Sequence, residues 1–131
     1  LGQLKATVRR NYSSPPTHGA RIVSAVLESA ELCATWKEEL NAMRVRIKAM
    51  REGLHAALVD RKPGRNFDYV LQQKGMFSFT GLSPEQVRTL REEYAVYLVG
   101  SGRLCMAALT ADTIAPAADA IATVLDGEER A

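Results

Sequence analysis

Apolar residues recur every three or four positions through the first half of the chain, which is the spacing of an amphipathic helix. The longest such stretch predicts one helix from about Ala30 to Arg61. Its apolar positions are Leu32, Trp36, Leu40, Met43, Ile47, Met50, Leu54 and Leu58. The opposite face is charged and carries Lys37, Glu38, Arg44, Arg46, Lys48 and Arg51. Such a stripe is typical of a helix packed on a hydrophobic core.

Two shorter helices are expected before this one. The chain opens with Leu1, Leu4 and Val8 at helical spacing and with no capping residue ahead of them. We therefore expect the chain to start inside a helix and to be a fragment or a processed form of a longer protein. The segment "NYSSPP" ends this helix, because proline lacks a backbone donor. Thr17 is then expected to cap a second helix that ends at about Glu28.

The second half of the chain alternates turns with short apolar runs. A turn at residues 62–66, "KPGRN", ends the long helix. Strands are expected at residues 67–73 and from Gly75 through "GMFSFTG". Two more short strands, "VYLV" and "LCMAAL", are expected on either side of the loop "GSG".

Two further helices carry clear start signals. Ser83 is placed as an N-cap with Pro84 in the first position, and this helix is expected to end at about Tyr94. A closing helix is expected with Asp112 as its N-cap and Pro116 in its first turn. The resulting order, α-α-α-β-β-α-β-β-α, predicts an α+β domain in which helices cover a small sheet.

Composition is that of an ordinary globular chain. It has 131 residues, 47% of them hydrophobic and 24% charged, which suits one domain. The formal net charge of +2 is too small to indicate nucleic-acid binding by itself. Residues 1–27 nevertheless carry four basic side chains and no acidic one. Such a basic start fits either an anion-binding site or a solvated surface.

Several kinds of site are not indicated. Cys33 and Cys105 have no neighbour at metal-ligand or redox spacing, so buried free thiols in a reducing compartment are expected. His18 and His55 are expected in surface or packing roles, and no metal site is predicted. No apolar run is long enough to span a membrane and no signal-peptide pattern is present, so we expect a cytoplasmic protein without a membrane partner.

Arg103 is the most informative single residue. It follows the loop "GSG" and leads into an apolar strand. The glycines permit a close approach of backbone or ligand, and a guanidinium group offers a rigid fork that suits a carboxylate. A surface ion pair at the end of a strand is the other interpretation. The residues alone leave both open.

Four segments, in this order and spacing, resemble the C-terminal third of class I aminotransferases, the aspartate and aromatic-amino-acid (tyrosine) enzymes that use pyridoxal 5′-phosphate. The resemblance runs from Gln3 to Leu125, and its segments are "VRRNYSSPPTHGA", "MRVRIKAMR", "GMFSFTGL" and "VYLVGSGRLCMAAL". The segments "RRNYSSPP", "RNFDYVLQQKGMFSFTGL" and "GRLCMA" look closer to the bacterial aromatic branch. Aspartate enzymes usually have asparagine where this chain has Ser14 and Cys105. The run Ala107 to Leu109 departs from the more usual Ala-Gly of the family.

The resemblance implies roles for five residues. Arg103 matches the arginine that binds the substrate α-carboxylate, and Phe77 matches a residue lining the substrate side of the pocket. Arg9 matches the arginine that reaches into the partner subunit's active site and binds a distal carboxylate. Tyr12 and Ser13 would lie near that interface and the active site.

The resemblance also implies a homodimer, the cofactor pyridoxal 5′-phosphate, and amino acids and 2-oxo acids as substrates. Residues 1–28 would be an interface and linker segment from the end of the large domain, and 29–131 the small domain of a fold-type I enzyme. The family's Schiff-base lysine lies upstream. None of the five lysines matches it, so the chain alone is expected to be inactive, with no catalytic residue of its own. These lysines are Lys5, Lys37, Lys48, Lys62 and Lys74.

Two other classes of function remain as alternatives. A non-catalytic interaction module could be built on the long amphipathic helix. A weak nucleic-acid binder could use the basic side chains of that helix, and its binding would depend steeply on salt. These side chains are Arg44, Arg46, Lys48 and Arg51. Neither alternative accounts for four motifs in series, so no nucleic-acid partner is expected.

Overall fold

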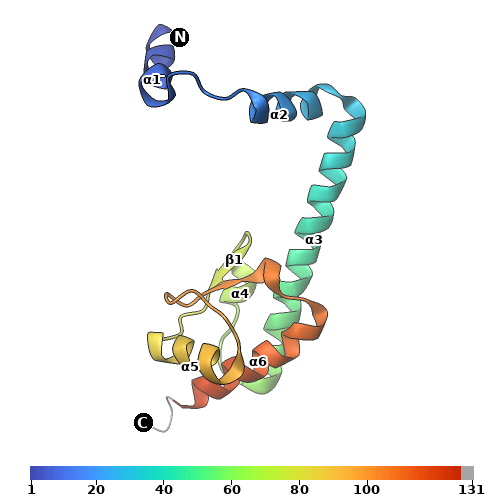
Figure 1. The fold of residues 1–131 in the computed structure, drawn as a ribbon. Coiled ribbons are helices and arrows are strands. Elements are labelled where there is room, and N and C mark those ends of the chain that lie inside the picture. The colour runs from blue at the N-terminus through green and yellow to red at the C-terminus, as the bar shows by residue number, and fades with distance from the viewer. Residues whose placement is uncertain (128–131) are drawn as a thin grey trace. The chain divides into compact units, whose positions relative to one another are not determined.

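The computed structural model describes residues 1–127, which form two compact units divided between Ala42 and Met43. In chain order the helices are α1 (Gly2–Tyr12), α2 (His18–Glu28), α3 (Ala30–Arg61), α4 (Tyr69–Gln72), α5 (Pro84–Tyr94) and α6 (Ala111–Asp126) (Figure 1). The strands are β1 (Phe77–Phe79) and β2 (Arg103–Cys105), and a short 3-10 helix, η1 (Met106–Ala108), follows β2. The three helices predicted for the first half of the chain are therefore confirmed.

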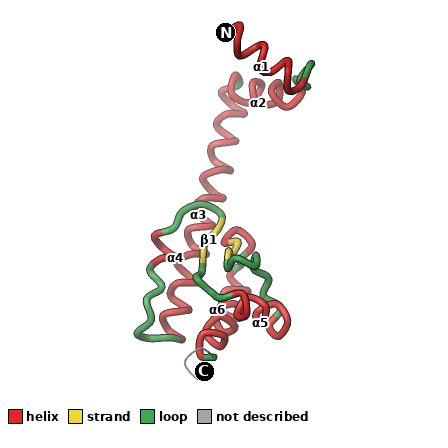
Figure 2. The backbone as a smooth tube through the Cα atoms, turned by 90° about the vertical axis from the view of Figure 1, so that its left-hand side faces the viewer, coloured by secondary structure: helices red, strands yellow, loops and turns green. Residues whose placement is uncertain are grey.

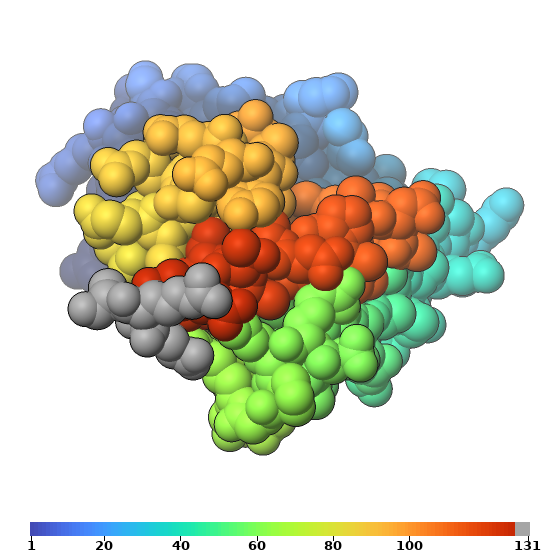
Figure 3. Space-filling view, turned by 90° about the horizontal axis from the view of Figure 1, so that it is seen from below, coloured from blue at the N-terminus to red at the C-terminus, as the bar shows by residue number. Residues whose placement is uncertain are grey.

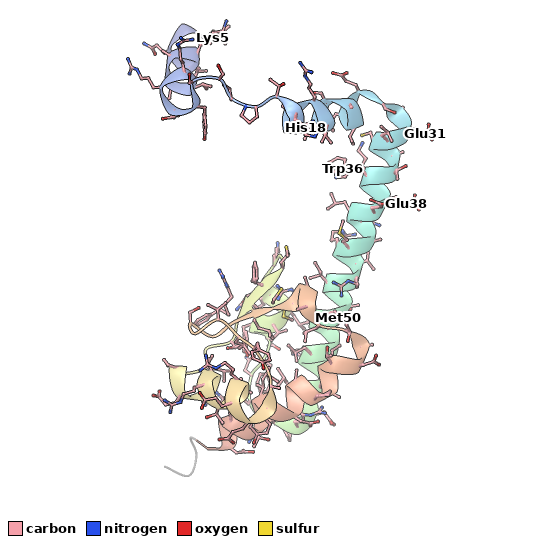
Figure 4. The ribbon with its side chains drawn as sticks, viewed as in Figure 1. Lys5, His18, Glu31, Trp36, Glu38 and Met50 are labelled. Atoms are coloured by element: carbon pink, nitrogen blue, oxygen red, sulfur yellow. The ribbon has the colours of Figure 1, made fainter. Side chains whose placement is uncertain are left out.

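The first unit contains α1, α2 and the start of α3, and its apolar side chains are largely exposed. No residue of α1 or α2 is buried. Leu32, Trp36 and Leu40, from the predicted stripe of α3, are each about half exposed, and Figure 4 shows the Trp36 side chain projecting from the helix. Thr17 precedes α2 as predicted, but its side chain makes no capping hydrogen bond. Ser29 does cap α3, since its hydroxyl accepts a hydrogen bond from the Leu32 backbone N–H at 3.3 Å.

The second unit has the hydrophobic core. The predicted stripe of α3 enters this core only toward its C-terminal end, where Leu54 and Leu58 are each 1% exposed. Ile47 and Met50, the latter labelled in Figure 4, are partly buried against the same core. The other core side chains come from α4, α5, β2, η1, α6 and the segments between them; the largest are Phe67, Val70, Leu82, Val87, Leu90, Leu104, Met106, Leu109, Ile121, Val124 and Leu125.

A two-stranded antiparallel sheet lies among the helices of this unit (Figure 2). Its pairs are Phe77 with Cys105, Ser78 with Leu104, and Phe79 with Arg103. Alternate residues of a strand point to opposite faces. The middle pair is buried and the two outer pairs are not, so one face of the sheet packs on the core. The prediction of an α+β domain with a short sheet is confirmed.

Two of the expected strands are wrong. Residues 67–73 form a turn and then α4, because the two buried side chains, Phe67 and Val70, are three positions apart and can share one face only in a helical turn. Residues 96–99, "VYLV", make only an isolated bridge from Val99 to Arg103. The strand expected for "LCMAAL" ends at Cys105 and continues as η1.

The start of α5 is as predicted, whereas that of α6 is earlier. The Ser83 hydroxyl accepts from the Gln86 N–H at 3.2 Å, and the Gln86 side-chain oxygen accepts from the Ser83 N–H at 2.9 Å, a complete capping box. Helix α6 has Thr110 as its N-cap, so Asp112 lies inside the first turn and Pro116 lies one turn deeper than expected. Thr110 takes the cap because its backbone is extended and its N–H donates to the Thr113 hydroxyl at 2.8 Å.

Ion pairs tie α6 to the end of α3. Arg61 pairs with Asp119, and Lys62 pairs with Asp126. Figure 3 shows α6 running between α5 and the turn at residues 62–66. Between α5 and α6, the buried side-chain amide of Gln86 donates to the Val124 carbonyl at 3.1 Å. These contacts join α6 to α5 and to the end of α3.

Both cysteines are free, as predicted, but each is half-buried instead of buried. The His55 side chain is partly buried, and its Nε2 lies 3.3 Å from Oδ1 of Asp68. Across residues 1–127 no helix is long and apolar enough to cross a membrane. The same residues contain no cluster of three or more side chains that could hold a metal ion.

Candidate functional site

Arg103 and Phe77 lie together on the outer face of the two-stranded sheet. The guanidinium carbon of Arg103 is 4.7 Å from the centroid of the Phe77 ring, a cation–π contact. Both side chains are exposed, Phe77 by 42%. The structure therefore brings together the two residues that the family resemblance places at the substrate.

The glycine loop before Arg103 is folded tightly enough to require glycine at one position. Gly102 has φ +80°, and a Cβ there would lie 3.2 Å from both the Leu82 carbonyl oxygen and the Thr80 hydroxyl. The Gly102 carbonyl accepts from the Thr80 N–H at 3.0 Å and from the Thr80 hydroxyl at 2.7 Å. The Val99 N–H in turn donates to the Arg103 carbonyl at 3.1 Å. These hydrogen bonds hold the backbone carbonyls of both Gly102 and Arg103 in place.

The charged surroundings of Arg103 bear on the two interpretations left open by the sequence. Within the described part of the chain no carboxylate lies at ion-pair distance from it, so the alternative of a strand-end ion pair is not supported. The guanidinium carbon lies over the Phe77 ring, 4.7 Å from its centroid. Two parallel N–H groups match the two oxygens of a carboxylate.

Arg51 of α3 is a buried side chain next to this sheet, with 5% of its surface exposed. Its two terminal nitrogens donate to one hydroxyl and three backbone carbonyls at 2.7–3.0 Å. The acceptors are Val70 O, Ser78 Oγ, Gly75 O and Phe77 O. Its assignment to the charged, solvent-facing side of α3 is therefore wrong. The signal was available, because Arg51 lies four residues after Ile47 and three before Leu54 on the apolar stripe.

Arg46 of α3 holds the segment that leaves β2. Its guanidinium donates to the Leu109 carbonyl at 3.0 Å and to the Ala107 carbonyl at 2.7 Å. Four basic side chains of α3 were considered for nucleic-acid binding. Two of them, Arg46 and Arg51, instead donate to backbone carbonyls of this unit. Lys48, a third member, lies 3.6 Å from Glu52. The structure does not support that alternative.

The Gln73 side chain makes hydrogen bonds to β1 like those of a neighbouring strand. Its side-chain oxygen accepts from the Phe79 N–H at 2.7 Å and from the Ser78 hydroxyl at 2.8 Å, and its amide donates to the Phe79 carbonyl at 3.1 Å. Sequence reasoning missed this residue, because it had been assigned to a strand of its own. Gln73 and Arg51 together satisfy the edge of β1 that β2 does not pair.

Arg9, Tyr12 and Ser13 lie together at the C-terminal end of α1 in the first unit. Arg9 and Tyr12 are exposed. Ser13 ends the helix with φ +58° and ψ −73°, a conformation rarely adopted by a residue with a side chain, and its N–H donates to the Arg9 carbonyl at 2.9 Å. The rigid Pro15-Pro16 segment follows directly. The chain is thus sharply turned at the end of α1, one turn after Arg9.

A family model described as aminotransferase class I and II matches residues 1–121. The chain belongs to this family. It is 56% identical over 125 residues to the aromatic-amino-acid aminotransferase of Escherichia coli (strain K12), covering 95% of this chain and 32% of that protein. It is 47% identical over 125 residues to the aspartate aminotransferase of the same organism, with the same coverage. The chain spans about a third of the length of the curated relatives that it matches.

Solved structures agree. A psychrophilic aromatic amino acid aminotransferase from Psychrobacter sp. B6, cocrystallised with aspartic acid, matches 95% of this chain and 31% of its own with a TM-score of 0.90 and 50% identity. An aromatic-amino-acid aminotransferase from Burkholderia pseudomallei, covalently bound to pyridoxal phosphate, matches the same shares with a TM-score of 0.89 and 51% identity. The resemblance noted in the sequence and the expected fold of the small domain are both confirmed.

The five lysines are the side chains that could condense with an aldehyde cofactor. A lysine that condenses with an aldehyde needs a lowered pKa, which burial or a neighbouring cation provides. Lys62 instead pairs with Asp126 and Lys48 with Glu52. The remaining lysines, Lys5, Lys37 and Lys74, are exposed. All five lysines are thus either exposed or paired with a carboxylate in the described residues.

Proposed function

We propose that this chain is the substrate-carboxylate-binding portion of a pyridoxal 5′-phosphate-dependent aminotransferase that acts on aromatic or dicarboxylic amino acids and the matching 2-oxo acids. The observation that carries the proposal is the contact between Arg103 and Phe77 in a chain of this family. A guanidinium with its donors exposed beside an aromatic ring suits a small molecule that has a carboxylate next to an apolar side chain.

In the proposed site Arg103 donates two parallel hydrogen bonds to the α-carboxylate, and Phe77 fixes the plane of the guanidinium. These contacts bind and orient the substrate. They are made equally by amino acid and 2-oxo acid, because both carry the same carboxylate. The amino-group transfer needs a Schiff-base lysine, which the family resemblance places upstream, so we propose that the isolated chain is inactive.

Arg9 is proposed as the second fork, for the distal carboxylate of a dicarboxylic substrate in the partner subunit's site. Support comes from the basic composition of residues 1–27 and from the exposed end of α1, where Tyr12 and Ser13 also lie. This role requires a homodimer. It also fits the proposed division into an interface and linker segment, residues 1–28, and a small domain, 29–131. The whole protein is proposed to act in the cytoplasm.

The aromatic branch is favoured over the aspartate branch. Identity to the Escherichia coli aromatic-amino-acid enzyme is 56%, against 47% for the aspartate enzyme of the same organism. The exposed ring of Phe77 beside Arg103 also suits a substrate with an aromatic side chain.

The test uses the whole protein loaded with pyridoxal phosphate and two arginine variants. Arg103→Lys is expected to raise KM about tenfold or more for phenylalanine and aspartate alike, because a lysine has no fork for the common carboxylate. Arg9→Gln is expected to raise KM for aspartate and to leave phenylalanine nearly unchanged. Equal kinetics for wild type and Arg103→Lys would contradict the proposal, as would turnover by the isolated chain.

A further inference from the structure

Arg51 makes its contacts at the backbone that carries Phe77. One terminal nitrogen donates to the Phe77 carbonyl at 2.7 Å and to the Gly75 carbonyl at 2.8 Å. The other donates to the Ser78 hydroxyl at 3.0 Å and to the Val70 carbonyl at 2.9 Å. The four acceptors thus surround one guanidinium, and three of them belong to residues 75–78.

The guanidinium carries a buried charge without a carboxylate partner among residues 1–127. Burial lowers the pKa of Arg51 from its ordinary value, although a guanidinium stays protonated at any physiological pH. A charge in this position is tolerated only if its donors are fully used. The carbonyls of Gly75 and Phe77 are therefore constrained to point at one fixed centre on α3.

This constraint reaches Arg103 through a single residue. Phe77 presents its carbonyl to Arg51 and its ring to the guanidinium of Arg103, which lies 4.7 Å from the ring centroid. A shift of the Phe77 backbone would move the ring and with it the surface on which Arg103 rests. We propose that Arg51 is a positioning residue that sets the place of the Arg103 fork through Phe77; this rests on the proposed function of Arg103.

Lysine is the informative replacement at position 51. It keeps the positive charge and most of the length, but its three donors radiate from one nitrogen and do not span four acceptors in a plane. Arg51→Lys therefore leaves the core occupied and releases part of the β1 backbone. A purely structural arginine would lower thermal stability on this change, yet the folded molecules would bind substrate as before.

The experiment measures the Kd of 3-indolepropionic acid, an aromatic monocarboxylate without an amino group, by calorimetry on the whole protein loaded with pyridoxal phosphate. Four proteins are compared with the wild type: Arg51→Lys, Arg103→Lys, the double variant, and Leu58→Ala. Leu58 is a buried residue of the same helix with no hydrogen bond to β1, so its variant controls for lost stability. KM and kcat for phenylalanine are measured alongside.

Arg51→Lys is expected to weaken binding about five- to tenfold and to raise KM more than it lowers kcat, because the carboxylate contact is made before and during the reaction. In the Arg103→Lys background the same change is expected to add less than about twofold, since Arg51 acts only through Arg103. Leu58→Ala is expected to lower Tm with an unchanged Kd.

Any other result contradicts either the positioning role of Arg51 or the proposed function of Arg103. If Arg51→Lys binds like the wild type while Arg103→Lys binds weakly, the positioning role is wrong and the function of Arg103 stands. If Arg103→Lys itself binds like the wild type, the proposed function fails independently of Arg51. Should Arg51→Lys not fold, Ser78→Ala removes one of its acceptors and is expected to weaken binding about twofold; an unchanged Kd there also refutes the proposal.

Discussion

Phe77 and Arg103 are diagonal neighbours across the two-stranded sheet. Phe77 pairs with Cys105 and Arg103 pairs with Phe79, so the cation–π contact joins residues offset by two positions on the same face. Long side chains reach such diagonal neighbours across antiparallel strands. The register of two short strands therefore decides whether the guanidinium rests on a ring, and every residue that holds this register affects the proposed site.

The contact itself can be tested with a matched pair of phenylalanines. In the whole protein loaded with cofactor, Phe77→Leu is expected to weaken the binding of phenylalanine about three- to tenfold, because a cation–π contact is worth roughly 0.5–2 kcal/mol. Phe79→Leu is the control: this ring is on the same face and more exposed, with no cation contact in the described residues. Equal KM values for the two variants would show that the contact does not matter for binding.

Gly102 offers a test of the loop that places Arg103. Alanine there needs φ near +80° and puts a methyl group 3.2 Å from the Leu82 carbonyl oxygen and the Thr80 hydroxyl. Gly102→Ala is expected to reduce the free energy of unfolding by roughly 1–3 kcal/mol. Gly100→Ala, in the same loop and with nothing within 4 Å, is expected to change it little. Urea denaturation of both variants measures the difference; a Gly102→Ala protein as stable as Gly100→Ala would contradict the loop geometry.

Local signals predicted some elements well and failed where tertiary contacts decide. The capping box at Ser83 depends on residues three apart, so the start of α5 can be predicted from a few letters. The segment of α4 has apolar, strand-like composition, and only the burial of Phe67 and Val70 on one side makes it helical. Short segments of this kind are ambiguous in sequence.

The candidate site divides in the same way. Arg103 and Phe77 could be predicted because they occur in motifs that resemble a family. Arg51 and Gln73 could not be assigned to the site, since their roles depend on backbone carbonyls and N–H groups, which leave no mark on the sequence. The charge of Arg51 favours a solvated position, although its spacing from Leu54 puts it at the edge of the buried stripe.

The pair of Arg61 and Asp119 predicts how acid acts on the link between α3 and α6. The hydrogen bond from Arg61 lowers the pKa of Asp119 below its ordinary value, and the same bond raises the pKa of Arg61. Because the folded carboxyl is harder to protonate than the unfolded one, its contribution to stability is present above the unfolded pKa of about 3.9 and is lost as the pH falls through the lower folded pKa.

Unfolding measured from pH 6 to pH 2 checks this sign. The wild type is expected to be more stable than Asp119→Asn by a constant margin above about pH 5, and the margin is expected to shrink steadily below about pH 4. Glu93→Gln serves as the control, since no ion pair of this exposed carboxylate occurs in residues 1–127. A margin that grows on acidification would refute the assigned direction of the pKa change.

The exposed apolar side chains of the first unit predict self-association of the isolated chain. Leu32, Trp36 and Leu40 repeat at four-residue spacing on α3 and are each about half exposed, and a contiguous apolar strip of this kind favours association. Light scattering on a size-exclusion column is expected to give a mass above 14.3 kDa that rises with concentration. Trp36→Lys with Leu40→Lys should shift this mass toward the monomer, whereas Lys37→Gln with Glu38→Gln, charge-neutral changes on the same helix, should leave it in place. A wild-type chain that stays monomeric at every concentration would mean that this strip does not drive association.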